Sequence, residues 1–167
     1  TDMYPQKTNN PGEDLLLVEN LETNFLKNIN FNVRKGEILG VAGLVGAQRT
    51  ELMEGIFGIR SHSKGKIKYQ GKEMVINRPK DAIDNGIAML TEDRRATGIM
   101  GVLSIADNIS IASLNKYLDF GVAINDKKIE ELVQDNIKKM NTKTPSSKTQ
   151  IQSLSGGNQQ KVLIGRW

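Results

Sequence analysis

The run GEILGVAGLVGAQRTELMEGIFG, at positions 36–58, constrains the fold more than any other part of the chain. Its apolar stretch Glu37–Gly43 is bounded by glycines, which is typical of a strand covered on both faces. A glycine-rich turn follows, and the spacing over Thr50–Phe57 predicts a helix. Because a strand, a glycine-rich turn and a helix in this order aim backbone N–H groups at one point, the run predicts a phosphate-binding loop.

The letters of this loop depart from the common pattern G-x-x-x-x-G-K-[ST]. Aligned on it, the chain has Gly43, Gln48, Arg49 and Thr50, with Gly46 as a further flexible residue. Arg49 keeps a positive charge as a planar guanidinium, and the Thr50 hydroxyl is the expected Mg²⁺ ligand. A positive φ at Gln48 would cost about 1 kcal/mol. Taken alone, the loop leaves a strand, turn and helix without any ligand open as the alternative.

A second motif, LSGGNQQK, occupies Leu154–Lys161 and is followed by VLIGRW. Its serine and two glycines come directly before a predicted helix, whose first N–H groups can receive an anion. The motif is also compatible with an ordinary capped helix start.

The rest of the chain alternates strands and helices, which predicts an α/β domain. The expected strands are LLLVENL (15–21), NINFNVR (28–34), KIKYQ (66–70) and IAML (87–90), the first three in an antiparallel sheet. The expected helices run from Pro79 to near Gly86 and from a capping Asp126 to Met140. Residues 1–14 have the composition of a linker, and a helical insertion is expected at about 104–150.

Composition excludes several functional classes. The net charge of +4 is small and its basic residues are spread among acidic ones, which argues against nucleic-acid binding. There is no Cys, so disulfides and thiolate metal sites are excluded, as is usual in the cytoplasm. Glycines interrupt the longest apolar run, which is too short to cross a bilayer.

Four stretches together resemble the ATP-binding-cassette (ABC) ATPases: GAQRT, TEDRRATGI, KTPSSKTQI and SLSGGNQQKVLIGRW. The resemblance is to the second cassette of double-cassette sugar importers, most closely those for galactosides, with ribose and xylose importers as alternatives. It implies a P-loop NTPase of ABC nucleotide-binding-domain type over residues 15–167, with an antiparallel β flank.

The resemblance also implies that ATP lies between the phosphate loop of one cassette and the signature motif of the other. In this chain, the loop residues that would bind ATP are Gly43, Gly46, Ala47, Gln48, Arg49, Thr50 and Glu51. The signature residues that would face the ATP of the partner cassette are Ser155, Gly156, Gly157, Asn158 and Gln159.

A catalytic and metal-binding role is implied for Glu92, which stands where the family usually has the Gln of its Gln loop. With Thr50 it would approach Mg²⁺, and it would also approach the attacking water. A solvated acidic turn flanked by Arg94 and Arg95 is the alternative. Phe25 is the candidate for stacking on adenine.

The implied partners are a first cassette of the same parent chain, transmembrane permease subunits and, indirectly, a periplasmic or extracellular sugar-binding protein. The implied location is the cytoplasmic face of the cell membrane. Because the family continues with an acidic strand after its signature helix, we expect a truncated cassette that is not an ATPase by itself. The alternative function is a structural cassette with a degenerate loop, whose signature completes the site of the partner cassette.

Overall fold

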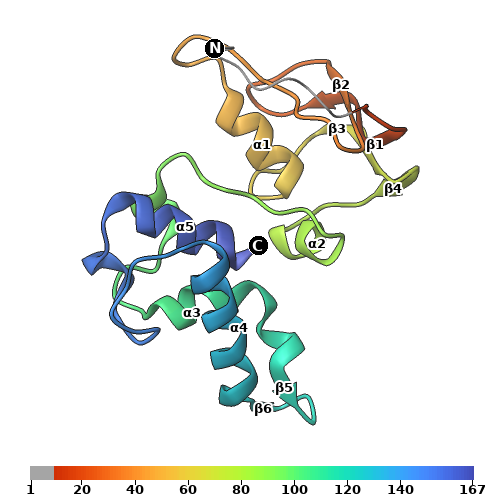
Figure 1. Ribbon diagram of the computed structural model, residues 1–167. Coiled ribbons are helices and arrows are strands. Elements are labelled where there is room, and N and C mark those ends of the chain that lie inside the picture. The colour runs from red at the N-terminus through yellow and green to blue at the C-terminus, as the bar shows by residue number, and fades with distance from the viewer. Residues whose placement is uncertain (1–9) are drawn as a thin grey trace. The chain divides into compact units, whose positions relative to one another are not determined.

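The structure is a computed structural model that describes residues 10–167, so most of the predicted linker at 1–14 lies outside the described residues (Figure 1). The chain divides into two compact units, one ending at Met89 and one spanning Leu90–Trp167, and each is described by itself. Within residues 10–167, no helix has the length and apolar character needed to span a bilayer.

The first unit contains a four-stranded antiparallel sheet in the order β2-β1-β3-β4. Its strands are β1 (Asp14–Glu22), β2 (Ile29–Arg34), β3 (Lys64–Tyr69) and β4 (Lys72–Met74). The three predicted antiparallel strands are confirmed, and β4 is an addition. Gln70 and Gly71 join β3 to β4 with φ values of 50° and 75°, because a two-residue hairpin needs left-handed backbone at both positions.

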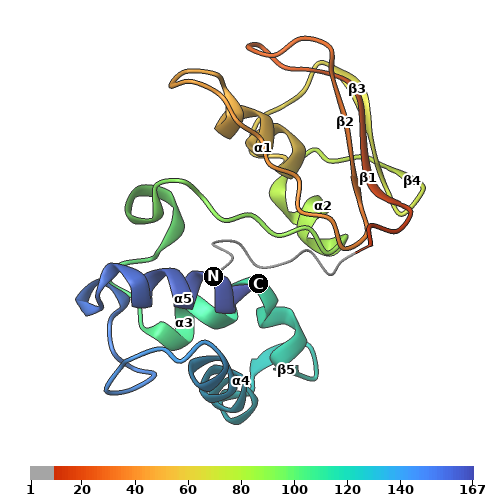
Figure 2. The same ribbon diagram turned by 45° about the horizontal axis from the view of Figure 1, so that its top comes forward.

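Two helices pack with this sheet, as Figures 1 and 2 show for α1: α1 (Arg49–Phe57) and α2 (Pro79–Asp84). Both lie where the sequence predicts them. Their shared core is formed by buried apolar side chains of two strands, both helices and the segment before α2, namely Val18, Leu21, Leu52, Ile56, Phe57, Ile67, Ile76 and Ala82. This core anchors α1, and thereby fixes the helix that follows the predicted phosphate loop.

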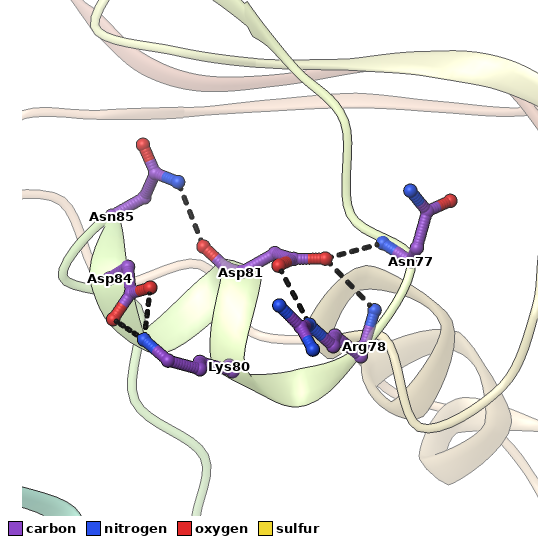
Figure 3. Close-up of polar contacts among 6 residues, drawn as sticks. All are labelled: Asn77, Arg78, Lys80, Asp81, Asp84 and Asn85. Atoms are coloured by element: carbon purple, nitrogen blue, oxygen red, sulfur yellow. Dashed lines mark hydrogen bonds and ion pairs between the residues drawn. The ribbon is translucent and has the colours of Figure 1, made fainter.

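The start of α2 is held by one carboxylate, as Figure 3 shows. Asp81 Oδ2 accepts from the backbone N–H groups of Asn77 at 3.0 Å and of Arg78 at 3.2 Å. The bond from Asn77 is the main reason why the pKa of Asp81 lies below its ordinary value. Lys80 and Asp84 form an ion pair one turn apart, at 2.6 Å.

Two predicted strands, 37–43 and 87–90, are wrong: neither segment forms a strand in the described chain. A strand exists through its ladder of hydrogen bonds, and no described strand pairs with either segment. The expected burial is also missing, since the side chain of Ile38 is 95% exposed and that of Leu90 is 55% exposed. The apolar pattern is typical of a buried strand, but the described residues contain no neighbouring strand that pairs with either segment.

The second unit is mainly helical. Its α-helices are α3 (Ile105–Ser110), α4 (Asp126–Lys139) and α5 (Gly156–Arg166), and its short hairpin consists of β5 (Leu118–Asp119) and β6 (Ala123–Ile124). A π-helical turn at Arg94–Gly98 and 3₁₀ turns at Ile111–Tyr117 and Ile151–Ser153 complete it. The core joins all three helices through Ile105, Ile109, Val133, Ile151 and Val162.

Helix α4 shows the predicted apolar face toward this core, with Val133 fully buried. Its predicted cap is wrong by one residue. Asn125 is the N-cap and accepts from the backbone N–H of Lys128 at 2.9 Å, whereas Asp126 is the first helical residue. Asx side chains cap equally well, and only the backbone conformation decides which of two neighbours does so. The bounds 104 and 150 of a helical insertion stay a prediction.

Candidate nucleotide-binding loops

The predicted phosphate loop leads directly into α1. Gly43 and Ala47 approach each other so closely that a Cβ on Gly43 would lie 2.6 Å from the Ala47 Cβ. The N–H of Ala47 donates to the carbonyl of Leu44 at 3.0 Å, which closes a turn. Gly46 has a φ of 84°. The backbone therefore turns sharply before the helix, as a loop that wraps an anion requires.

Gln48 is the N-cap of α1 and lies in the left-handed region, with φ 61° and ψ 28°. The condition for backbone strain at this position is therefore met. Its side-chain Oε1 is buried and has no hydrogen-bond partner among the described residues. An unpaired buried amide oxygen is itself unfavourable. Gln48 therefore destabilises the loop in two ways, through its left-handed backbone conformation and through its unpaired amide oxygen.

Arg49, Thr50 and Glu51 form the first turn of α1. The backbone N–H groups of a first turn have no acceptor within their helix, and they favour an anion in front of it. The Arg49 guanidinium and the Thr50 hydroxyl are group types that bind phosphate and Mg²⁺, respectively. Glu51 has the opposite effect, because its carboxylate adds negative charge to the same turn.

The predicted signature loop precedes α5, with Ser155 as its N-cap. Both polar atoms of the Asn158 side-chain amide form hydrogen bonds that stabilise this loop. Nδ2 donates to Ser155 Oγ at 3.0 Å, and Oδ1 accepts from the Lys143 N–H at 2.9 Å. Because the Ser155 hydroxyl accepts from Asn158, its own proton remains available for an outside acceptor. Gly157 is exposed at the second position of the helix.

Gln159 and Arg94 support the signature loop from behind. The Gln159 side chain is 3% exposed, and its Nε2 donates to the carbonyls of Leu154 at 3.1 Å and Ile151 at 3.3 Å. Its Oε1 accepts from Arg94 Nε at 3.2 Å. The other end of Arg94 lies on Gly156, where a Cβ would be 2.5 Å from Nη2. No pattern in the sequence predicts this contact.

Glu92 is exposed and precedes the π-helical turn. The neighbouring Asp93 caps that turn, accepting from the N–H groups of Arg95 at 2.9 Å and Ala96 at 3.0 Å. The bond from Ala96, followed by that from Arg95, holds the pKa of Asp93 below its ordinary value. Residues 10–167 contain no cluster of three or more His, Cys, Asp or Glu that would hold a metal ion. A Mg²⁺ ligand role for Glu92 or for Thr50 stays a prediction.

Phe25, the predicted adenine-stacking residue, is 58% exposed. The Arg60 guanidinium lies over its ring, 5.8 Å from the centroid, and is also paired with Glu54 of α1. One ring face therefore already carries a cation–π contact.

Comparison with known proteins agrees with these two motifs. Residues 26–167 match the family model described as ABC transporter. The chain is 51% identical over its whole length to the galactose/methyl galactoside import ATP-binding protein of Clostridium tetani, and 49% identical to that of Haemophilus influenzae. In both cases it covers 34% of the relative, so the chain spans about a third of these proteins.

Solved structures agree on the fold. An ATP-binding cassette of an ABC transporter in its ADP conformation has a TM-score of 0.70 at 19% identity, with 93% of this chain and 64% of that chain covered. A dimeric cassette bound to ADP and phosphate has a TM-score of 0.73 at 18% identity, with 91% and 68% covered. The chain therefore belongs to the ABC transporter family, and its fold is that of the ATP-binding cassette, a P-loop NTPase.

Proposed function

We propose that the chain is part of an ATP-binding subunit that energises sugar import, with galactose or methyl galactoside as the sugar. The observation that carries the proposal is the 51% identity along the whole chain to an import ATP-binding protein for these sugars, in an alignment that spans both predicted nucleotide-binding motifs. The proposed partners are a first cassette of the same parent protein, transmembrane permease subunits and, indirectly, an extracytoplasmic sugar-binding protein. The proposed site of action is the cytoplasmic face of the membrane.

The two loops have separate tasks in this proposal. Residues 43–51 hold the phosphates of one ATP through backbone N–H groups and the Arg49 guanidinium, and the Thr50 hydroxyl is offered to Mg²⁺. Residues 155–158 meet the terminal phosphate of a second ATP, which is held by the partner cassette. ATP bound between two cassettes supplies the energy for transport by closing them and by its hydrolysis. Glu92 approaches the metal and the attacking water.

Uptake of labelled galactoside into membrane vesicles that contain the full transporter tests the proposal. We expect ATP-dependent uptake that unlabelled galactose suppresses and that ribose and xylose do not. Uptake suppressed by ribose or xylose instead would reassign the sugar. Uptake without ATP would contradict the proposal itself.

Titration with Mg-ATP tests the phosphate loop separately. In the full-length protein with its first cassette disabled, the double change Gln48→Gly and Arg49→Lys should strengthen nucleotide binding by about tenfold, because it removes the unfavourable φ and restores a compact ammonium. Thr50→Val in the same background should abolish the Mg²⁺ dependence. If neither change alters binding, residues 43–51 do not bind phosphate.

A further inference from the structure

Arg94 contacts the start of α5, behind the signature loop, although it is remote from this helix in the sequence. Its Nη2 occupies the space above Gly156 where any other residue would place a Cβ, 2.5 Å away. Gly156 is the first residue of α5. The guanidinium therefore sits at the helix end where backbone N–H groups are unpaired.

The position of Arg94 is fixed by its neighbours. Its Nε donates to Gln159 Oε1 at 3.2 Å, and Gln159 is buried with its Nε2 bonded to two carbonyls. The amide of Gln159 cannot rotate without losing those bonds, so its oxygen stays directed at Arg94. At its backbone, Arg94 begins the π-helical turn that Asp93 caps. The side chain is therefore held at both ends.

The charge of Arg94 has no carboxylate partner at ion-pair distance among residues 10–167. The charges of Asp93 and Arg94 attract each other, but the Asp93 carboxylate is directed at the N–H groups of the turn and is not at ion-pair distance from the guanidinium. A cation at the N-terminal end of a helix is unfavourable, because that end carries partial positive charge. An anion placed between the two removes this cost and gains a charge-assisted hydrogen bond.

We propose that Arg94 is a phosphate-binding residue of the signature site, and that it contacts the terminal phosphate of the ATP held by the partner cassette together with Ser155 and the first N–H groups of α5. Gln159 is its positioning residue, and Gly156 is a glycine because the guanidinium needs the space. This inference rests on the proposed function, in which the signature loop faces that ATP.

The test uses the full-length two-cassette protein and compares binding of Mg-ATP with binding of Mg-ADP at the site that the signature loop completes. Arg94→Gln should weaken ATP binding by about tenfold and ADP binding by less than about twofold, because ADP lacks the terminal phosphate. Arg94→Lys should recover part of the ATP affinity. The matched control is Arg95→Gln, which removes the same charge from the neighbouring exposed residue and should leave both affinities unchanged.

Gly156→Ala supplies an independent route to the same result, since the new Cβ displaces the guanidinium. It should reproduce Arg94→Gln, and the double variant should lose little more than either single variant. An equal loss for ATP and ADP would assign Arg94 a purely structural role, and an Arg94→Gln variant that behaves like Arg95→Gln would also overturn the inference.

Ser155→Trp in the same assay separates this inference from the proposed function. If Ser155→Trp abolishes ATP binding at that site while Arg94→Gln does not, only the role of Arg94 fails. If both variants bind ATP normally, the signature loop does not face the nucleotide and the proposed function fails with it.

Discussion

Arg166 and Asn108 are joined by two hydrogen bonds from one guanidinium: Arg166 Nε donates to the Asn108 carbonyl at 2.7 Å, and Nη2 donates to Asn108 Oδ1 at 3.0 Å. A third bond runs from Nη1 to the carbonyl of Gly98 at 2.9 Å. Asn108 is fully buried and also bonds the backbone of Met100 in both directions. The end of α5 is thereby tied to α3 and to the end of the π-helical turn.

Replacing Arg166 by Met should therefore destabilise the second unit by about 2 kcal/mol, because three carbonyl-type oxygens lose a charged donor. Arg166→Lys should recover only a part, since one ammonium cannot reach all three acceptors. Urea unfolding followed by circular dichroism measures both. Arg95→Met, at an exposed arginine, is the control and should change stability little. If Arg166→Met is as stable as the control, the three hydrogen bonds of Arg166 do not stabilise the second unit.

Gln48 offers a gain in stability. Gln48→Gly should stabilise the first unit by about 1 kcal/mol, because the glycine adopts the observed φ of 61° without a Cβ penalty. Gln48→Ala keeps that penalty while it removes the unpaired amide, so comparison of the two separates backbone strain from amide burial. The measurement is again the urea midpoint. A glycine variant less stable than the alanine variant would show that the backbone at this position is not strained.

Asp93 predicts a dependence of stability on pH. Its folded pKa is lowered by the N–H groups that it accepts from, with lesser help from the charges of Arg94 and Arg95. A lowered folded pKa stabilises the protein above the unfolded value of about 3.9, and this stabilisation disappears as the pH falls through the folded pKa. Asp93→Asn retains a capping oxygen but does not titrate. Its urea unfolding midpoint should therefore fall less than that of the parent protein between about pH 5 and about pH 3, which lie on either side of the unfolded pKa of about 3.9.

The exposed Glu131→Gln variant on α4 is the control for a general loss of carboxylate charge. An Asp93→Asn variant with the same acid sensitivity as the parent would remove Asp93 from the explanation.

The sequence predicts local structure well where periodicity and capping chemistry decide it. The alternation in β2, Pro79 at the start of α2 and the apolar face of α4 all predict the observed elements. The same reasoning fails at 37–43, because a buried strand forms only where other strands pair with it, and the sequence of the segment itself does not show whether they are present. The spacing of the glycines predicts both loops, and the longer sequence stretches around them indicate the protein family.

Arg94 was missed for a physical reason. In the sequence, Arg94 is one of two arginines beside an acidic turn. Such a pattern is equally typical of solvated surface residues. Its proposed role depends on contacts with Gln159 and Gly156, and no periodic pattern connects residues so far apart in the chain. Only the folded second unit brings the three residues together.

The most direct test of the account asks whether the signature loop faces the other cassette. This chain has no Cys, so Ser155→Cys introduces a single thiol into it. A second thiol is placed in the phosphate loop of the first cassette, in a full-length protein whose remaining cysteines have been replaced. We predict that mild oxidation cross-links the two thiols in the presence of Mg-ATP, which closes the two cassettes on each other, and much less in its absence. In a separate variant that carries Ser155→Cys and Arg49→Cys in this chain, we predict no cross-link between them. Cross-linking of Ser155→Cys to Arg49→Cys, with none to the first cassette, would contradict it.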